Sequence, residues 1–506
     1  MKRIISLLCL LYFVQISYGK GIHVGTGQTY KRIFDATRIH AVQAGDTIYM
    51  HAGIYTDAGQ VFDSLIGTPN KWIVIRPYQN DSVSIHVQYT FQHAQYLKIS
   101  GLNFYGGDTS QNGKFYHLLF IDYALVCYTS NHNIIVENCS FTEHHVPTNL
   151  GNSAASLKIT GADSFIIQNC HFKNCTNIAD GISMNADKNG IIRYNKFENI
   201  DGNGSHCKGG VVNILYENNL FINCNASAIN IGGATGASFF CPSKNAKYEA
   251  DSIMVYSNIT IGGTVGFDFI TCNYSQIINN TCYKATEYAL RCLNEDTLYP
   301  FGNNYCYNNI FAPNSKYGIY MNAGGLKDYS TFYFSNNLYH DYKNADPKKI
   351  WWGELIGSTD SNEMIGDPLF TDTAHWDFTL QKGSPAIGTG KKVAQPLMDY
   401  AGNYFGSVRS VGALEYSGNV GIKSIDEINA LKIYPNPAKN YFTIQWIGLA
   451  TIKSVEIYNL SGSMLHAIPV AGYQIKINVA DLPKGLYQVK IICSNGQIFT
   501  KSLILN

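Results

Sequence analysis

The segment IIVENCSF, residues 134–141, decides the fold, because the chain repeats its pattern of β-branched residues, asparagine and a closing aromatic. Apolar and polar residues alternate along it, which is typical of a short strand with one buried face. The aromatics Phe141, Phe172, Phe197 and Phe221 are separated by 31, 25 and 24 residues. A period of this length predicts the stacked coils of a parallel β-solenoid. The other copies are FIIQNCHF (165–172), GIIRYNKF (190–197), NILYENNLF (213–221), QIINNTCY (276–283), YCYNNIF (305–311) and FYFSNNLY (333–339).

A second short strand recurs between these phrases, so each coil is expected to have at least two strands. Examples are SLKIT (156–160), GISMN (181–185) and AINIG (228–232). Such a strand buries little surface alone, but stacked coils pair its backbone and cover its apolar face. The repeated asparagines suit turns in which side-chain amides bond the backbone and one another in a ladder.

The repeats resemble the right-handed parallel β-helix of the pectin-lyase-like superfamily. The segments AVQAGDTIYMHAGIYTDA (41–58) and GTPNKWIVIRPYQNDSVSI (67–85) are similar to the first coils of such proteins. The resemblance implies a short helix within residues 30–43 that caps the core, and final coils around residues 364–390. We therefore expect an all-β chain with a right-handed parallel β-helix over residues 20–416, followed by a small β-sandwich.

Charge and the N-terminus indicate an exported protein with no nucleic-acid partner. Lys and Arg number 37 against 36 Asp and Glu, so the chain has no excess of positive charge that would favour binding to nucleic acid. Residues 1–19 combine Lys2 and Arg3 with an apolar run from Ile4 to Val14, which is the pattern of a signal peptide. No later segment approaches the roughly 20 apolar residues that a membrane helix needs. We expect an exported monomer without a transmembrane segment.

Cysteine spacing leaves two explanations open. Cys9 lies in the expected signal peptide, and an exported protein can oxidise the cysteines that remain. Four of them recur at similar places in the repeat, where small side chains stacked in a core explain them equally well. These four are Cys139, Cys170, Cys224 and Cys282.

The composition changes near the C-terminus, where short alternating strands are separated by Asn-Pro, Ser-Gly and Lys-Gly pairs. This pattern is typical of a small β-sandwich. The segments YPNP (434–437), LSG (460–462) and LPKGLY (482–487) closely resemble the C-terminal sorting domain of the type IX secretion system. The resemblance implies that type IX machinery carries the protein to a secreted or cell-surface location, with a linker at 417–424 and the sorting domain at 425–506. An ordinary carbohydrate-binding sandwich is the alternative.

A β-helix has little interior space, so we expect a ligand on the outward face of its strands, where inward and outward side chains alternate. Alignment of the segment SHCKG with GISMN points Ser205 and Cys207 inward. His206 and Lys208 then face outward, beside Asn230 of the next coil. A slip of one residue would invert this assignment.

The segment DGNGSHCKGGVVNILYENNLF (201–221) resembles the family of chondroitinase B and related alginate lyases. Members of that family cleave uronic-acid chains by β-elimination, for which a base must remove a proton next to the sugar carboxylate. The resemblance implies that Lys208 is this base. His206, which faces outward on the same strand, is a second catalytic candidate, with a groove or surface residue as the alternative. The resemblance also implies that Asp201 and Asn203 help to bind calcium, which requires several oxygen ligands.

Two functions remain open. The first is a polysaccharide lyase that acts on an acidic polysaccharide, with Asn185, Asn230 and Arg291 expected to bind the chain. The second is a non-catalytic glycan-binding or adhesive surface protein. The absence of an arginine on the coil after Lys208 favours the second, because the lyase family has one there. In that case Lys208 is a solvated surface lysine and Asp201 a turn residue.

Overall fold

The computed structural model describes residues 19–506, apart from the short segments given at the end of this paragraph. Residues 1–18 of the expected signal peptide and the expected linker at 417–424 therefore lie outside the described residues. The chain divides into two compact units, residues 1–366 and 367–506. Residues 367–416, which we assigned to the β-helix from the sequence, group with the second unit. The segments left out are 40, 58–59, 107–116, 123–130, 147–153, 237–239, 241–246, 316–318, 323–329, 343–349, 352–359, 417–430, 447–450, 460–462, 473, 495–497 and 506.

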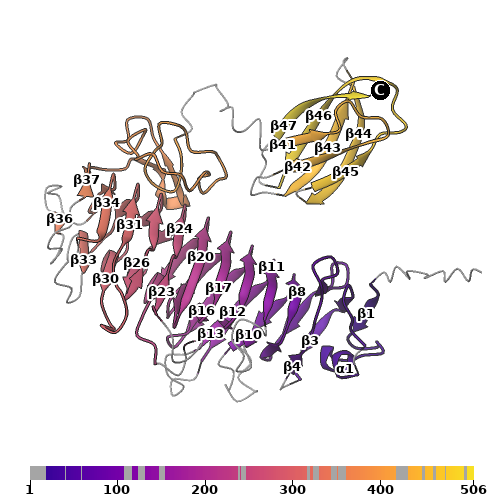
Figure 1. Cartoon of the computed structure of the whole chain (residues 1–506), viewed down its shortest axis with the longest axis horizontal. Coiled ribbons are helices and arrows are strands. Elements are labelled where there is room, and N and C mark those ends of the chain that lie inside the picture. Colours follow the sequence, from indigo (N-terminus) through magenta and orange to yellow (C-terminus); the bar gives the residue numbers. More distant parts are fainter. Residues whose placement is uncertain are drawn as a thin grey trace, which may run out of the picture. The chain divides into compact units, whose positions relative to one another are not determined.

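The first unit is a solenoid of three parallel sheets, which we call A, B and C (Figure 1). A typical coil runs through β14 (Asp163–Gln168) in sheet A, β15 (His171–Thr176) in sheet B and β16 (Asp180–Asn185) in sheet C. Each coil thus has three strands where the sequence predicted at least two. The reason is that the asparagine of the repeated phrase lies in a turn, so that one phrase forms the end of a sheet-A strand and the start of a sheet-B strand.

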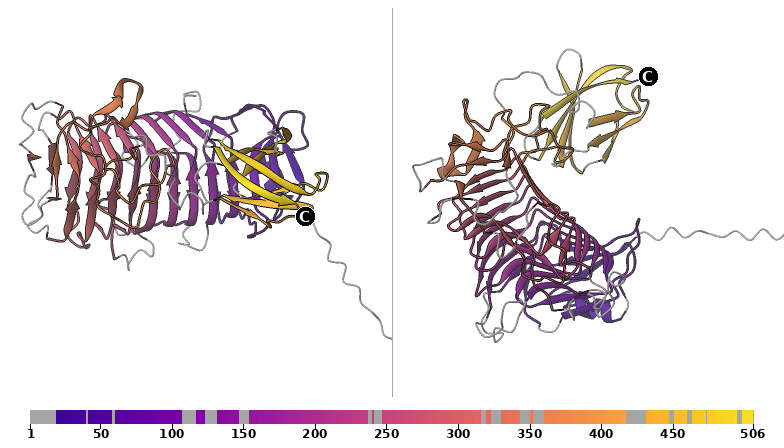
Figure 2. Two further views of the ribbon diagram at one scale, coloured as in Figure 1. Left: turned by 90° about the horizontal axis from the view of Figure 1, so that it is seen from above. Right: turned by 60° about the vertical axis from the view of Figure 1, so that its left-hand side comes forward.

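The strands of successive coils lie side by side along the solenoid (Figure 2). Over the described residues, sheet A has 15 strands, sheet B 12 and sheet C 11. Besides β14, sheet A contains β1 (Gly21–Val24), β2 (Thr47–Met50), β5 (Ile73–Pro77), β8 (Gln95–Ser100), β11 (His132–Glu137), β17 (Lys188–Arg193), β20 (Val211–Glu217), β23 (Ala250–Asp251), β24 (Met254–Tyr256), β27 (Cys272–Asn273), β28 (Gln276–Ile278), β31 (Asn304–Tyr307), β34 (Phe332–Ser335) and β37 (Asp360–Ser361). Besides β15, sheet B contains β3 (Gly53–Tyr55), β6 (Val83–Ile85), β9 (Asn103–Tyr105), β12 (Ser140–His145), β18 (Lys196–Ile200), β21 (Leu220–Cys224), β25 (Ile259–Ile261), β29 (Thr281–Tyr283), β32 (Ile310–Ala312), β35 (Leu338–Tyr339) and β38 (Met364–Ile365). Besides β16, sheet C contains β4 (Gln60–Asp63), β7 (Tyr89–Gln92), β10 (His117–Asp122), β13 (Ala155–Thr160), β19 (Ser205–Lys208), β22 (Ser227–Gly232), β26 (Val265–Ile270), β30 (Tyr288–Leu293), β33 (Ile319–Asn322) and β36 (Ile350–Trp351).

The closing aromatics of the repeated phrase form a stack inside the solenoid. The rings of Phe141 and Phe172 are parallel within 3°, with centroids 4.7 Å apart, and the stack continues through Phe197 to Phe221. All four rings are buried. The two-dozen-residue period therefore places like side chains above one another, which buries large apolar surface in every coil. At one end of the core, the helix α1 (Ile33–Arg38) buries Ile33 and Ala36, within the range expected for a cap.

A column of buried asparagines runs through the turns between sheets A and B. Each amide donates from Nδ2 to the Oδ1 of the next rung, as Asn219 does to Asn258 at 2.9 Å and Asn258 to Asn280 at 3.0 Å. Each Oδ1 also accepts the backbone N–H of the preceding rung, at 2.9 Å between Asn219 and Asn258. The predicted amide ladder is confirmed. We call this set the buried column; its members are Asn195, Asn219, Asn258, Asn280, Asn309 and Asn337.

The cysteines of the described residues are free and buried. Cys139 and Cys170 occupy the turn positions that asparagines take in later coils, and the backbone N–H of Cys170 donates to Asn195 Oδ1 at 2.9 Å. Of the two explanations that the sequence left open, stacked small side chains in the core is the one observed for these residues.

The second unit ends in a small antiparallel sandwich. One sheet contains β41 (Leu431–Tyr434), β42 (Tyr441–Trp446) and β45 (Gln474–Asn478). The other contains β43 (Ile452–Tyr458), β44 (Met464–Gly472), β46 (Gly485–Cys493) and β47 (Ile498–Leu505). The unit also has the hairpin of β39 (Phe370–Asp372) and β40 (Asp377–Leu380), joined by the short 3₁₀ helix η3 (Thr373–His375). In the part of the chain that the structure describes, no helix is long and apolar enough to cross a membrane.

Candidate active site

The strand β19 has the alternation predicted from the sequence. Ser205 and Cys207 are buried, whereas His206 and Lys208 are partly exposed. In the parallel register Lys208 lies opposite Asn185 of β16, and His206 lies opposite Asn230 of β22. The strand is therefore not shifted by one residue, and these four side chains share the outward face of sheet C.

A second lysine, Lys158 of β13, belongs to the same face. It lies opposite Ser183 in the register, and Ser183 lies opposite His206. The Lys158 ammonium donates to Ser183 Oγ at 2.9 Å and to Asn185 Oδ1 at 2.5 Å. Burial lowers the pKa of Lys158 to about 8; the carboxylate of Asp180 opposes this shift and the charge of Lys208 adds to it.

The carboxylate of Asp180 anchors the other side of this face. Its Oδ1 accepts the backbone N–H of Asn203 at 2.7 Å and Asn203 Nδ2 at 2.9 Å. Its Oδ2 lies 3.6 Å from His206 Nδ1, while His206 Nε2 lies 2.9 Å from the carbonyl oxygen of Gly232. Because a carbonyl oxygen can only accept, Nε2 carries the proton of that bond. We call Lys158, Asp180, Asn185, His206 and Lys208 the lysine cluster.

The turn after Lys208 is held in place by the buried carboxylate of Glu249. Gly209 and Gly210 have φ values of +69° and +93°, a conformation that residues with a Cβ rarely adopt. The backbone N–H of Gly209 donates to Glu249 Oε2 at 2.8 Å, and Thr235 Oγ1 donates to the same oxygen at 2.8 Å. Burial raises the pKa of Glu249, and these hydrogen bonds oppose the shift. The glycines are thus turn residues, and they set the position at which the Lys208 side chain leaves the sheet.

The outward row that contains His206 continues over three more coils. Asn230 lies opposite Asp268 of β26, and Asp268 lies opposite Arg291 of β30. Asn230 Oδ1 is buried and has no hydrogen-bond partner among the described residues. Asp268 is fully buried and accepts from Arg291 Nε at 2.7 Å and Nη2 at 2.8 Å. Arg291 therefore lies on the same face as the lysine cluster but not within it.

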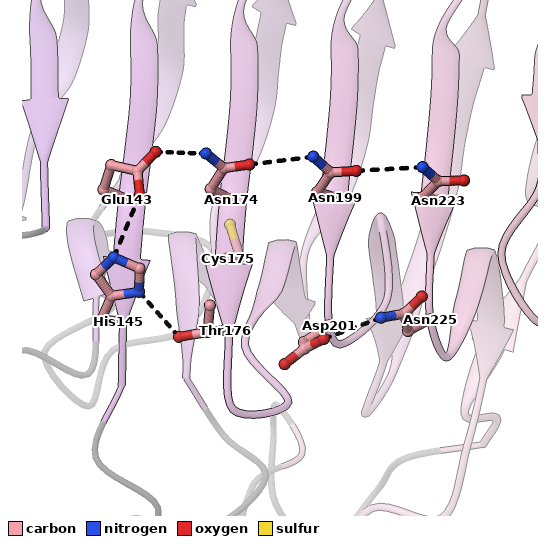
Figure 3. A pocket seen from close by; sticks show the side chains of 9 residues that line it. All are labelled: Glu143, His145, Asn174, Cys175, Thr176, Asn199, Asp201, Asn223 and Asn225. Carbon is pink, nitrogen blue, oxygen red and sulfur yellow. Dashed lines mark hydrogen bonds and ion pairs between the residues drawn. The ribbon is translucent and has the colours of Figure 1, made fainter.

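The two residues expected to bind calcium do not converge. Asp201 accepts the backbone N–H of Asn177 and the Nδ2 of Asn225, both at 2.9 Å, on the sheet-B side of its turn (Figure 3). The Asn203 amide instead donates to Asp180 at the edge of sheet C. Among the described residues, no three His, Cys, Asp or Glu side chains are grouped as metal ligands. This arrangement does not fit the six to eight oxygen ligands of a calcium site.

Two family models match the chain. Residues 88–241 match a right handed beta helix region, and residues 432–506 match a secretion system C-terminal sorting domain. The structure combines a parallel β-helix, within which residues 88–241 match the first model, with a C-terminal sandwich, the sorting tail, that matches the second. The tail indicates type IX secretion, to the outside of the cell or to its surface. No curated protein matches the sequence.

Solved structures similar to this β-helix protein include several that act on polysaccharides. A PL6 family alginate lyase, AlyGC, matches with a TM-score of 0.37 and 13% identity over 80% of this chain and 58% of its own, so the chain spans less than two thirds of that enzyme. A rhamnogalacturonan lyase matches with a TM-score of 0.41 and 10% identity over 81% of this chain and 97% of its own. The A-module of the Azotobacter vinelandii mannuronan C-5 epimerase AlgE6 matches with a TM-score of 0.42 and 15% identity over 66% and 93%. At these values the matches say nothing about the reaction of this chain.

Sequence reasoning missed two charged members of this face of the β-helix, Lys158 and Asp268. Lys158 lies in the strand SLKIT, between the buried residues Leu157 and Ile159. Alignment of that strand with GISMN would have placed it outward opposite Ser183, in the row of His206. Asp268 lies between the buried Phe267 and Phe269, so the same alignment applies there. The sequence does not show which of these outward side chains are in contact. The rotamer of a lysine decides whether it contacts the residue opposite it on the next strand or a residue further along that strand.

Proposed function

We propose that the outward face of sheet C is the active site of a lyase that cleaves an acidic polysaccharide by β-elimination. The observation that supports it is the pair of lysines, Lys158 and Lys208. They lie on strands two coils apart, and Asn185 of the coil between them accepts from Lys158 and lies opposite Lys208. Burial lowers the pKa of Lys158 and the charge of Lys208 adds to this shift, which are conditions under which a lysine loses its proton near neutral pH.

The reaction needs two different things from these lysines. A uronic acid releases the proton on the carbon next to its carboxylate only when a cation neutralises that carboxylate. A base must then accept this proton, and a base works best when its pKa lies near the working pH. A single lysine cannot do both at once, since the cation must be protonated and the base must not.

In this proposal Lys158 is the base and Lys208 is the cation. Lys158 has the lowered pKa of about 8, so a fraction of it is neutral at pH 7. Its amine takes the proton, and the electron pair of the C–H bond forms a C=C double bond in the ring. The bond from the ring to the glycosidic oxygen breaks, and that oxygen takes a proton from water at this open face. The role of base that the sequence suggested for Lys208 thus moves to the lysine two coils earlier.

The remaining residues of this face bind the sugar chain or position other groups of the site. His206 has its two ring nitrogens directed at Gly232 and Asp180, so we assign it a positioning role rather than a step in proton transfer. Asn185 and Asn230 offer amides to sugar hydroxyls on the coils beside the lysines. Arg291 lies three coils beyond His206, a separation of about 14 Å for strands about 4.8 Å apart, and would contact a more distant sugar of the chain. No step is routed through calcium, since the residues present do not fit it.

A non-catalytic glycan-binding protein remains the second candidate. The observation that favours it is the bidentate pair of Arg291 with the buried Asp268, which leaves no arginine within the lysine cluster. On this alternative the face binds an acidic chain and leaves its length unchanged.

The test is to incubate the purified protein with alginate, pectate and glycosaminoglycans and to follow the absorbance of the unsaturated product. We expect product on at least one of them, with a loss of about 100-fold or more in Lys158→Ala and Lys208→Ala. The control is Lys188→Ala, since Lys188 is a partly exposed lysine on sheet A that pairs with Asp163 at 3.2 Å. Absence of product on every acidic glycan, with and without added calcium, would contradict the proposal. Binding without chain shortening would support the second candidate.

A further inference from the structure

A groove lies along sheet B of the β-helix, on a different sheet from the lysine cluster. It has a volume of about 320 Å³ and is open to solvent along sheet B (Figure 3). Two rows of outward side chains border it, and they come from the consecutive strands β12, β15, β18 and β21 and the turns that follow. The first row is Glu143, Asn174, Asn199 and Asn223; the second is His145, Thr176, Asp201 and Asn225. We call it the sheet-B groove.

The backbone explains why the surface is hollow there. The residues of the first row have left-handed φ values, from +52° at Glu143 to +56° at Asn174 and Asn199. A left-handed residue within a strand bends that strand locally. Because four neighbouring strands bend at the same position, the bends align and produce a groove that runs along the solenoid axis.

The first row is an amide ladder that faces solvent. Asn199 Nδ2 donates to Asn174 Oδ1, and Asn223 Nδ2 donates to Asn199 Oδ1, both at 3.2 Å. Asn174 in turn donates to Glu143. A primary amide has two N–H groups and two acceptor sites, so each rung keeps hydrogen-bonding capacity beyond the ladder. The ladder ends at Gly262 of the next coil, where a Cβ would lie only 2.5 Å from Asn223 Oδ1.

The second row also offers neutral hydrogen-bonding groups. His145 Nδ1 lies 3.1 Å from Thr176 Oγ1, and Asn225 Nδ2 donates to Asp201 Oδ1 at 2.9 Å. The neighbouring His144 points inward and is buried, as expected for adjacent residues on a strand. The side chains of Thr176, Asp201 and Asn225 thus face the groove from successive coils (Figure 3).

The charges of the groove are opposite in kind to those of the lysine cluster. Among the residues that the structure describes, no lysine or arginine lines it, whereas Glu143 and Asp201 do. His145 Nε2 lies 3.2 Å from Glu143 Oε2, so the imidazole compensates one carboxylate at most. The lysines nearby on the same strands, Lys173 and Lys196, pair with Glu198 at 3.1 and 2.7 Å. An acidic polysaccharide is therefore repelled here, and a ligand rich in hydroxyl groups but without charge is favoured.

We infer that the sheet-B groove binds a neutral polysaccharide, along the solenoid axis and apart from the acidic chain proposed for sheet C. The amides of Asn174, Asn199 and Asn223, which repeat in three successive coils, can bond hydroxyl groups that repeat in each sugar. The coils lie about 4.8 Å apart, a spacing similar to the rise of an extended sugar residue. An exported protein with both sites would hold a neutral glycan while the sheet-C face meets an acidic one. The inference does not depend on catalysis at sheet C.

The experiment measures binding of cellohexaose, mannohexaose and xylohexaose to the full chain by calorimetry. The variant is Asn223→Gly, because glycine keeps the left-handed backbone at φ +53°. The matched control is Asn213→Gly on sheet A, since Asn213 is also exposed, has φ +57° and donates to Asn189 at 2.7 Å in a ladder of its own. We expect at least one probe to bind, with affinity about tenfold lower in Asn223→Gly and unchanged in Asn213→Gly.

Two further outcomes separate this inference from the proposal for sheet C. Lys208→Ala should leave the binding of the neutral probe unchanged, even if it abolishes product formation from an acidic glycan. The inference is overturned if none of the three neutral probes binds, or if Asn223→Gly and Asn213→Gly bind the same probe equally well. In either case the asparagine ladder of the groove only stabilises the fold.

Discussion

The buried column of asparagines and the lysine cluster are built by the same coils, yet they use polar side chains in opposite ways. In the buried column every rung repeats the one before, so each amide finds a partner in its neighbour. On sheet C the row changes at each coil, from Lys158 to Ser183 to His206. Neighbours in this row are satisfied only in part: Lys158 donates to Ser183, whereas Asn230 Oδ1 has no partner among the described residues. Burial lowers the pKa of Lys158. In this solenoid, the regular buried column stabilises the fold, whereas the irregular row on sheet C presents the groups that we propose for the reaction.

The largest effect on stability is expected when one asparagine of the buried column is removed. In Asn258→Ala, the backbone N–H and Nδ2 of Asn219 lose their acceptor, and the carbonyls of Tyr216 and Tyr256 lose a donor. Each buried group without a partner costs on the order of 1–3 kcal/mol. We expect the free energy of unfolding of the first unit to fall by about 3 kcal/mol or more, measured by urea unfolding. A loss below about 1 kcal/mol would show that the column is not a main source of stability.

At the end of the buried column Asn337 bonds to Asp360, so the stability of the first unit should depend on pH there. Asn337 Nδ2 donates to Asp360 Oδ2 at 2.7 Å, and burial raises the pKa of Asp360 to about 6 from 3.8. The folded state thus binds a proton that the unfolded state releases between about pH 4 and 6, so Asp360 stabilises below that window and the gain is lost as the pH rises through it. We expect Asp360→Asn to be more stable than the wild type by about 2 kcal/mol at pH 7, with no difference at pH 4. Equal stability at both pH values would contradict this.

The pH dependence of the reaction tests the roles that we assign to the two lysines of the lysine cluster. With Lys158 as base, kcat/KM on the acidic glycan should rise about tenfold between pH 7 and pH 9, because the neutral fraction of a group with a pKa of about 8 rises by that factor. Lys208→Arg keeps the cation and should keep the rise. If Lys158 instead supplied the cation, the rate would fall over the same range.

The smallest effect is expected for the exposed ladder of the sheet-B groove. Asn199→Gly removes the bonds to Asn174 and Asn223 but keeps the left-handed backbone. Water replaces the lost partners at this exposed position, so the free energy of unfolding should change by less than about 0.5 kcal/mol. Measured beside Asn258→Ala, this variant isolates burial as the cause of the difference between two ladders of the same residue.

The fold was predictable because its signal is repeated many times. The Asn-aromatic phrase recurs often enough that its spacing predicts the stacked coils, the phenylalanine stack and the amide column. The third strand per coil was missed because the turn between sheets A and B has only two residues, such as Asn169 and Cys170 between β14 and β15, and so short a break is not visible in the sequence pattern. The division of the chain after residue 366 was likewise not visible in composition.

The candidate site was predictable only in part. The alternation along β19 and the neighbours of Lys208 follow from the period, and the structure has them where expected. The proximity of Lys158 Nζ to Asn185 does not follow, because a long side chain can reach across rows. Asp201 and Asn203 are two residues apart in sequence, yet the turn directs them to different sheets. Spacing along the chain could not distinguish these cases.

By itself the sequence determined the architecture: strands of alternating polarity, a period of about two dozen residues, and a C-terminal segment that matches a secretion sorting domain. These three features depend on local residue patterns and on a repeat, and both can be read along the sequence without knowledge of contacts in space. Only the tertiary structure decided which charges meet, since the free energy of a buried charge depends on the distance to groups one or two coils away. The contact of Lys158 with Asn185, opposite Lys208, and the separation of Asp201 from Asn203 are therefore properties of the stacked coils rather than of any segment.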